Sequence, residues 1–375
     1  MNRLIIVGNG FDLAHGLKTS YCDFITNYLV EVLNTFHEKD YYDDPLIKIA
    51  HYAAQSRYHF PVKFPISDES VFTDLQCLNE DRFFNIEIKS SLLKKTIDKT
   101  RDLKWVDLEN EYFDELNECR DLTTQVFSKD KVTLLNDQFQ YIKEKLEEYL
   151  IEAQFGNGQF KKDPAIDKIF RSHINKEDIL DKNGSSTLRK IMFLNFNYTN
   201  TLNKYLGSTY QYSILTNGQQ EVKDSINYIH GQLENKCNPI VFGFGDEYDS
   251  KYKEFELSRN NDLFRHIKSF AYLKTKNYHD LIRFLMKDKF QVFIVGHSCG
   301  LSDRTMFREI FSHENCRSIK VFYYERPNGT TDFTEKTYDI ARHFIDKGEM
   351  RKKIVPEPLS SPLPQYNQKY LVQKI

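Results

Sequence analysis

Four short stretches of the sequence combine glycine or asparagine with polar side chains where a predicted strand ends. They are GNGFD at 8–12, NFNYTN at 195–200, HG at 230–231 and GHSCGLSD at 296–303. Backbone N–H groups and side chains of these types can bind phosphates, orient water and move protons. In an open α/β sheet, ligands bind outside the carboxyl ends of the strands. We therefore expect the four stretches to line one pocket.

The first stretch is typical of a loop in which the backbone approaches a phosphate. Gly8 ends a predicted strand at 3–8, and Gly8 and Gly10 together form a GxG pattern that precedes a helical segment. The third position of a full dinucleotide-binding motif is occupied by Leu13 rather than Gly or Ala. A tight turn capped by Asp12 is the competing interpretation. The residues predicted to contact a nucleotide here are Gly8, Asn9, Gly10, Phe11 and Asp12.

Asparagine and histidine are the candidate catalytic residues. The amides of Asn195 and Asn197 can hold ribose hydroxyls or position a water molecule, although asparagine clusters more often form turns. His230 follows a predicted strand, where it is placed to act as a general base or to contact a ribose. A single histidine is more often structural, so the strand-end position is what supports the functional interpretation.

The stretch GHSCG also matches the GxSxG nucleophile elbow of α/β-hydrolases, with Ser298 as the nucleophile. That fold needs an acid and then a histidine on loops of later strands. The chain after Ser298 contains one predicted strand and a Pro-rich tail, and both His313 and His343 fall in predicted helical stretches. Serine hydrolysis is therefore the weaker alternative.

The composition is that of a globular protein. The 375 residues include 29 Phe and 23 Tyr, and 52 Lys+Arg against 54 Asp+Glu give a formal net charge of −2. Nothing in this balance indicates nucleic acid or a membrane surface as a partner. The six cysteines are scattered without a CxxC pair, so we expect no metal centre and a reduced, cytoplasmic setting.

The hydrophobic pattern predicts an α/β, Rossmann-like fold, with a mostly parallel sheet and helices on both faces. Strands are expected at 3–8, 191–196, 225–229, 239–242, 290–295 and 319–324. A helix should begin after Ser20, with Asp23 completing a capping box, and another should span 336–347. We predict a single domain at 1–350, with its core at 1–34 and 186–350. A large helical insertion at 35–185 interrupts it, and a tail follows at 351–375.

The order of these motifs, with WVDLE at 105–109, resembles that of the AbiH family of bacteriophage abortive-infection proteins. The long N-terminal motif GNGFDLAHGLKTSY is its most specific part. The resemblance spans nearly the whole chain and implies a role in bacterial defence, by harming or arresting the infected cell. It also implies a phage-derived trigger, and assembly into a homo-oligomer is a further expectation.

The same order remotely resembles the sirtuin-like NAD-binding fold. That resemblance implies a phosphate loop at Gly8 and Gly10, a catalytic Asn197 and a catalytic His230. It further implies that Gly296 and Ser298 of the late loop line the nucleotide, and we also predict His297 and Asp303 of the same stretch as cofactor-binding residues. The absence of a cysteine quartet for a structural zinc argues against protein deacylation. NAD or a related nucleotide is the expected ligand, and both simple nucleotide binding and cleavage of the glycosidic bond of NAD stay open as hypotheses.

In that hypothesis, Asn197 orients the ribose or a water molecule and His230 takes a proton. Asp12 or Asp303 stabilises the positive charge that develops on the ribose. The alternative from another class is a non-catalytic nucleotide-binding sensor that switches a partner.

Overall fold

The computed structural model describes residues 1–51, 60–103, 107–121, 123–156, 162–180, 187–206, 210–214 and 218–365. Trp105 and the last ten residues of the predicted tail lie outside these ranges. Contacts divide the chain into two compact units. The first unit comprises Met1–Lys18, Leu150–Tyr252 and Ile267–Ile375, and the second comprises Thr19–Tyr149 and Lys253–His266. These bounds differ from the predicted insertion at 35–185, and the domain organisation itself stays a prediction.

A seven-stranded sheet forms the centre of the first unit, in the order β10-β9-β8-β1-β5-β7-β6. The strands are β1 (Asn2–Val7), β5 (Lys190–Asn195), β6 (Tyr210–Ile214), β7 (Gly218–Tyr228), β8 (Phe290–Val295), β9 (Cys316–Tyr323) and β10 (Ser361–Pro362). All are parallel except β6, which pairs antiparallel with β7. The chain moves outward from β1 through β5 to β7, then returns to β8 on the other side of β1. This is the doubly wound order, which confirms the Rossmann-like prediction.

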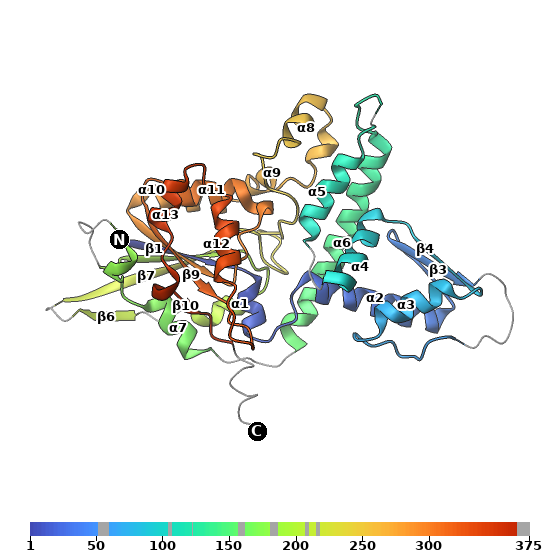
Figure 1. The fold of residues 1–375 in the computed structure, drawn as a ribbon, viewed down its shortest axis with the longest axis horizontal. Helices are drawn as coiled ribbons and strands as arrows, with labels where there is room; N and C mark the ends of the chain where they lie inside the picture. The colour runs from blue at the N-terminus through green and yellow to red at the C-terminus, as the bar shows by residue number, and fades with distance from the viewer. Residues whose placement is uncertain are drawn as a thin grey trace, which may run out of the picture. The chain divides into compact units, whose positions relative to one another are not determined.

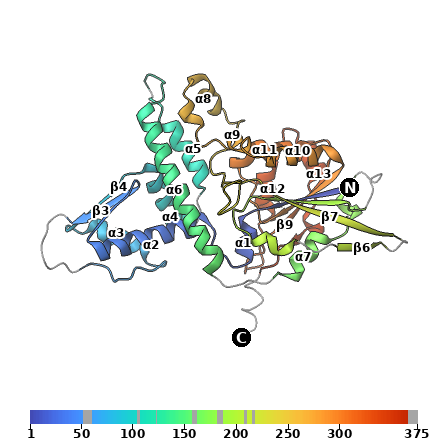
Figure 2. The ribbon, with the colours of Figure 1, turned by 180° about the vertical axis from the view of Figure 1, so that it is seen from behind.

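Helices cover both faces of this sheet (Figures 1 and 2). On one face, Leu4 and Ile6 belong to a core with α10 (Asn277–Lys287), α11 (Arg304–Ser312) and α12 (Phe333–Ala341). On the other face, Ile5 and Val7 belong to a core with α1 (Asn9–Ala14) and α7 (Pro164–Arg171). Since both faces of β1 are covered, its residues 4–7 form a continuous apolar run.

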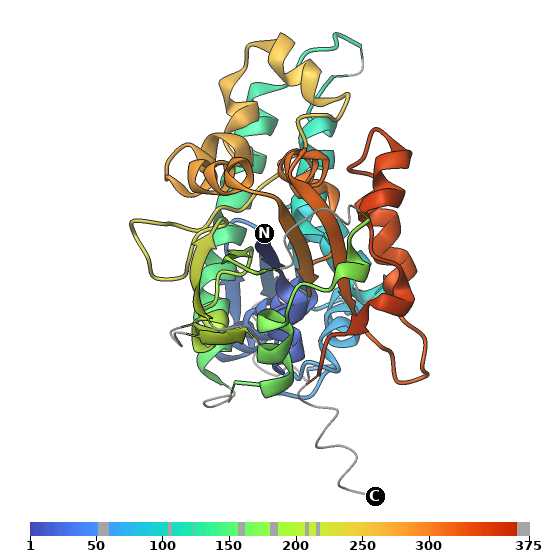
Figure 3. The same cartoon turned by 90° about the vertical axis from the view of Figure 1, so that its left-hand side faces the viewer.

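The parallel strands end level with one another. Val7 lies opposite Asn195 on one side and Val295 on the other, and Asn195 lies opposite Tyr228. β1 occupies the middle of the sheet, where the label N marks its start in Figure 3. The loops that follow β1, β5, β7 and β8 therefore leave the same edge.

Two local predictions for the first unit were wrong. The apolar run at 239–242 forms no strand, because it packs against the turn after β7, where Val241 N–H donates to His230 O at 2.7 Å. The single helix expected at 336–347 is interrupted. Its first part lies in α12, and α13 (Lys347–Lys353) begins where it was expected to end. The short helix α9 (Lys268–Tyr272) also belongs to this unit.

The second unit contains helices and a three-stranded antiparallel sheet, in the order β2-β3-β4. Its strands are β2 (Tyr41–Asp43), β3 (Ile47–His51) and β4 (Phe84–Ile88). Its helices include α2 (Tyr21–Lys39), α3 (Val71–Glu80), α4 (Ser91–Leu103) and α5 (Leu108–Glu118). The long helix α6 (Lys129–Gly156) and α8 (Tyr252–Ser258) extend from one unit into the other along the chain. This small sheet was not predicted, and its first strand, β2, has only three residues.

The predicted start of α2 is confirmed. Ser20 Oγ accepts from Asp23 N–H at 3.1 Å, and Ser20 N–H donates to Asp23 Oδ2 at 3.1 Å. Among the described helices, none is long and apolar enough to cross a membrane. No group of three or more His, Cys, Asp or Glu within the described ranges is arranged to hold a metal ion.

Candidate functional site

The loops that follow β1 and β8 pack directly against each other at the point where the strand order reverses. Gly10 N–H donates to Gly296 O at 2.7 Å. A Cβ atom on Gly296 would lie 2.2 Å from Phe11 N, and the φ of Gly296 is +68°. A Cβ atom on Gly8 would lie 2.6 Å from His297 Cδ2. Glycine is therefore needed at these positions for a structural reason, because a side chain would prevent the close approach of the two loops. Phosphate binding by Gly8 and Gly10 stays a prediction.

Asp12 is buried on α1, and one of its two carboxylate oxygens is hydrogen-bonded. Its Oδ2 accepts from Thr199 Oγ1 at 2.6 Å, whereas its Oδ1 is buried without a hydrogen-bond partner among the described residues. Burial raises the pKa of Asp12 to about 6, although the side chains of Thr199, Thr201 and Asn197 oppose the shift. The carboxyl group therefore titrates close to neutral pH.

The two predicted asparagines connect the loop after β5 to its surroundings. Asn195 is fully buried, and its Oδ1 accepts from Asn197 N–H at 3.2 Å. Its Nδ2 has no hydrogen-bond partner within the described part of the chain. Asn197 Nδ2 donates to Gly8 O at 3.1 Å. Asn197 thus joins the loop after β5 to the loop after β1, so these two predicted elements do meet.

His230 lies in a buried polar cluster that we call the His230 cluster, with Lys268, Tyr272 and Asp303. His230 Nε2 lies 3.0 Å from Asp303 Oδ1 and 3.0 Å from Tyr272 Oη. Lys268 Nζ donates to the same Asp303 oxygen at 2.9 Å. Sequence reasoning missed Lys268 and Tyr272. Neither residue stands in a motif, and lysine is rarely buried unless it is paired.

The charges of the His230 cluster determine its proton positions. Burial alone would raise the pKa of Asp303, but Lys268 and His230 together hold it well below its usual range. Burial lowers the pKa of His230, so its ring is neutral near pH 7. Because ionised Asp303 can only accept, Nε2 of His230 carries the proton. The other nitrogen, Nδ1, then carries a lone pair, and it makes no hydrogen bond to a described residue.

His297 and Ser298 follow β8, and only His297 is buried. Phe196 lies between the rings of His230 and His297, with centroid distances of 4.7 and 4.3 Å. His297 Nδ1 accepts from Cys299 N–H at 2.9 Å, and burial lowers the pKa of His297 to about 3. Ser298 is exposed.

This loop lacks the geometry of a nucleophile elbow. That turn places its serine in a strained conformation. Here positive φ values occur at Gly296 and Cys299 instead. Within the described ranges, no histidine is hydrogen-bonded to Ser298. The serine-hydrolase alternative therefore gains no support.

A comparison with protein families decides what kind of protein carries this site. The model of the family described as "Bacteriophage abortive infection AbiH" matches residues 4–325. The chain belongs to the AbiH family. Membership supports a role in abortive infection, the bacterial defence against bacteriophage. A search of curated proteins returned no match.

The remaining predicted residues of this AbiH-family chain have clear structural positions. Phe11 is fully buried and packs against Phe170 and Tyr205, with ring centroids 6.0 and 5.6 Å away, so its side chain belongs to the core. Asn9 is half-buried at the start of α1. Asp107 of the WVDLE stretch lies in the second unit, where it caps α5 by accepting from Asn110 N–H at 3.2 Å.

Proposed function

We propose that the chain binds NAD or a related nucleotide at the carboxyl edge of the parallel sheet and cleaves the bond between the nicotinamide and the ribose. The observation that carries the proposal is the His230 cluster. It presents a buried, neutral histidine whose tautomer is fixed by an ionised carboxylate. A histidine in this state is suited to general-base catalysis at neutral pH.

Two unpartnered polar atoms support a ligand with hydroxyl groups. Asp12 Oδ1 can accept a hydrogen bond, and Asn195 Nδ2 can donate one, yet both are buried without a partner in the described chain. Leaving a buried polar atom unpaired costs about 1–3 kcal/mol. A ribose hydroxyl can both donate and accept, so it could satisfy either atom. These two atoms favour a ligand with hydroxyl groups, such as a nucleoside, over a purely apolar ligand.

The proposed reaction is hydrolysis. The C–N glycosidic bond breaks, and its electron pair leaves with nicotinamide. The oxygen of a water molecule forms the new bond to the ribose carbon, and the proton of that water passes to His230 Nδ1. Asp303, which is paired with Lys268, holds the imidazole in place. The ionised form of Asp12 would stabilise the positive charge that develops on the ribose. Asn197 would position the ribose or the water.

NAD consumption by the purified chain, with and without phage lysate, tests this function. We expect turnover by the wild type, and a loss of at least roughly a hundredfold in His230→Ala, the effect of removing a general base. Asn197→Ala should also lose turnover. His279→Ala is the matched control, because His279 is exposed on α10. Turnover that persists in His230→Ala would refute this assignment of the base.

A non-catalytic nucleotide sensor is the second candidate, and the glycine contacts favour it. A Cβ atom on Gly8 would collide with His297, and one on Gly10 or Gly296 would collide with backbone atoms. Asn197 connects two loops through its hydrogen bond to Gly8 O. Packing therefore accounts for these residues without a catalytic role. Calorimetric titration with NAD, combined with plaque counts on cells carrying His230→Ala, separates the candidates. Binding and defence that both survive in His230→Ala would favour the sensor.

A further inference from the structure

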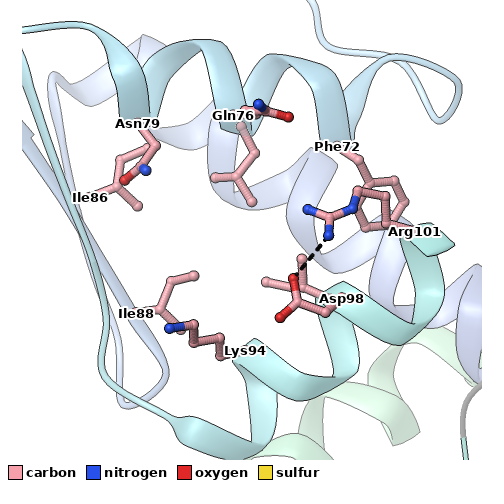
Figure 4. Close-up of a pocket in the computed structure, with 10 residues that line it drawn as sticks. Phe72, Gln76, Asn79, Ile86, Ile88, Lys94, Asp98 and Arg101 are labelled. Carbon is pink, nitrogen blue, oxygen red and sulfur yellow. Dashed lines mark ion pairs between the residues drawn. The ribbon is translucent and has the colours of Figure 1, made fainter.

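The second unit contains a pocket of about 360 Å³ between α3, β4 and α4 (Figure 4). Its apolar lining comes from all three elements: Phe72, Leu75, Ile86, Ile88 and Ile97. Leu75 and Ile97 are buried, whereas Ile86 and Ile88 are half-buried. None of these side chains belongs to the site described above. The pocket therefore requires its own explanation.

The rim of the pocket carries one positive charge without an acidic partner among the described residues. Arg101 is neutralised, because its guanidinium lies 3.3 Å from Asp98 and donates to Asp102 at 2.7 Å. Figure 4 shows the pair of Arg101 and Asp98 at one end of the pocket and Lys94 beside Ile88. Lys94 is exposed and forms no ion pair with a described residue. An acidic group on a ligand would complement it.

The strand beside the pocket is an edge strand. β4 pairs with β3 and with no other described strand. Lys89 N–H donates to Leu46 O at 2.9 Å, and hydrogen-bonded pairs alternate along an antiparallel ladder. The N–H and C=O groups of Ile86 and Ile88 must then point away from β3, toward the open edge. The same two residues therefore offer side chains to the pocket and backbone groups to a further strand.

We propose that this pocket binds an extended segment of a partner protein, which pairs with β4. An apolar side chain of the segment enters the pocket, and an acidic side chain pairs with Lys94. Backbone pairing with an exposed edge supplies affinity, and pockets for alternate side chains supply specificity. A small molecule fits less well, because such sites enclose most of their ligand and this pocket has an exposed rim. The proposal is independent of NAD cleavage.

Selection of random dodecapeptides on the full-length chain tests the proposal. We expect the selected peptides to alternate apolar and polar residues and to carry an acidic residue. In fluorescence anisotropy, Ile88→Asp should weaken their binding by at least roughly tenfold, since a charge replaces an apolar contact at the centre of the interface. Circular dichroism of Ile88→Asp checks that the unit is still folded.

Exchanging the charges of Lys94 and of the peptide's acidic residue gives a test that does not depend on whether Ile88→Asp folds. Lys94→Glu should weaken binding by roughly three- to tenfold, and a peptide with lysine in place of its acidic residue should recover the loss. Lys131→Glu is the matched control, because Lys131 is exposed on α6 in the same unit. Three results would overturn the proposal: no selected peptides, peptides that bind Ile88→Asp equally well, or no recovery after the exchange.

Discussion

Replacing Lys268 with methionine removes the ammonium group that neutralises Asp303. The two charged atoms lie 2.9 Å apart, and the side chains are 0% and 6% exposed. At an effective dielectric constant of about 20, their Coulomb attraction is ~6 kcal/mol, most of which offsets the cost of burial. Methionine keeps the apolar stem but leaves a buried carboxylate without its cation. We expect a loss of about 3–5 kcal/mol in the free energy of unfolding.

Urea unfolding of a double-mutant cycle with Asp303→Asn measures this effect. The amide that this second substitution introduces keeps a neutral acceptor for His230 and Tyr272, so the double variant buries no unpaired charge. We expect its loss to be smaller than the sum of the two single losses, by about 2 kcal/mol or more. Losses that add within about 0.5 kcal/mol would refute a buried ion pair at this position. Lys131→Met is the control for the substitution itself at an exposed site.

Lys268→Met also has a predicted pH dependence. Lys268 contributes to the lowered pKa of His230, so its removal raises that pKa. His230, the proposed base, is then protonated at a higher pH. In a pH profile of any NAD turnover, the decline on the acid side should therefore move to higher pH. The pKa of Asp303 is depressed in the folded state, so its ionised form adds stability above the unfolded pKa of about 4. That contribution is lost as pH falls toward the folded pKa, and the advantage of the wild type over Lys268→Met should shrink there.

Three further substitutions test other features. The pKa of Asp12 is raised to about 6, so the folded state holds more protons than the unfolded state between about pH 4 and 6, and stability falls as pH rises. Asp12→Asn keeps an acceptor for Thr199 and serves as the reference. Relative to this variant, unfolding titrations should show that the free energy of unfolding of the wild type falls by about 3 kcal/mol between about pH 4 and 6. Gly296→Ala should lower the melting temperature far more than Gly329→Ala. Both have positive φ, but a Cβ on Gly329 meets nothing within 4 Å. Ser20→Ala should cost about 0.5–2 kcal/mol in urea unfolding, because it breaks the capping box of α2.

The sequence was informative where the chain is buried on both sides. β1 and β8 each end in a short apolar run, and a run of that kind followed by glycine can be recognised without a structure. Parallel strands place their carboxyl ends on one edge, so the convergence of GNGFD, NFNYTN, HG and GHSCG could be predicted from the fold class. The roles of the residues in those stretches stay predictions.

The sequence was uninformative where a side chain gains its partner from a distant element. Lys268 lies on a five-residue helix, and its partner Asp303 stands 35 positions later. Nothing local to KSFAY distinguishes a buried lysine from an exposed one. The small sheet was missed for another reason: β2 has three residues, too few for an alternating pattern to stand out.

The contact between the two glycine loops determines how the nucleotide hypothesis can be tested. The loops after β1 and β8 approach each other closely because they have glycine at positions 8, 10 and 296. A side chain at any of these positions would disturb the packing of the loops, whether or not a ligand binds there. Loss of activity in a glycine variant would therefore not distinguish binding from folding. The buried atoms without partners among the described residues, Asp12 Oδ1 and Asn195 Nδ2, are better probes. A ligand that pairs with them should raise the melting temperature of the wild type more than that of variants in which either atom is removed.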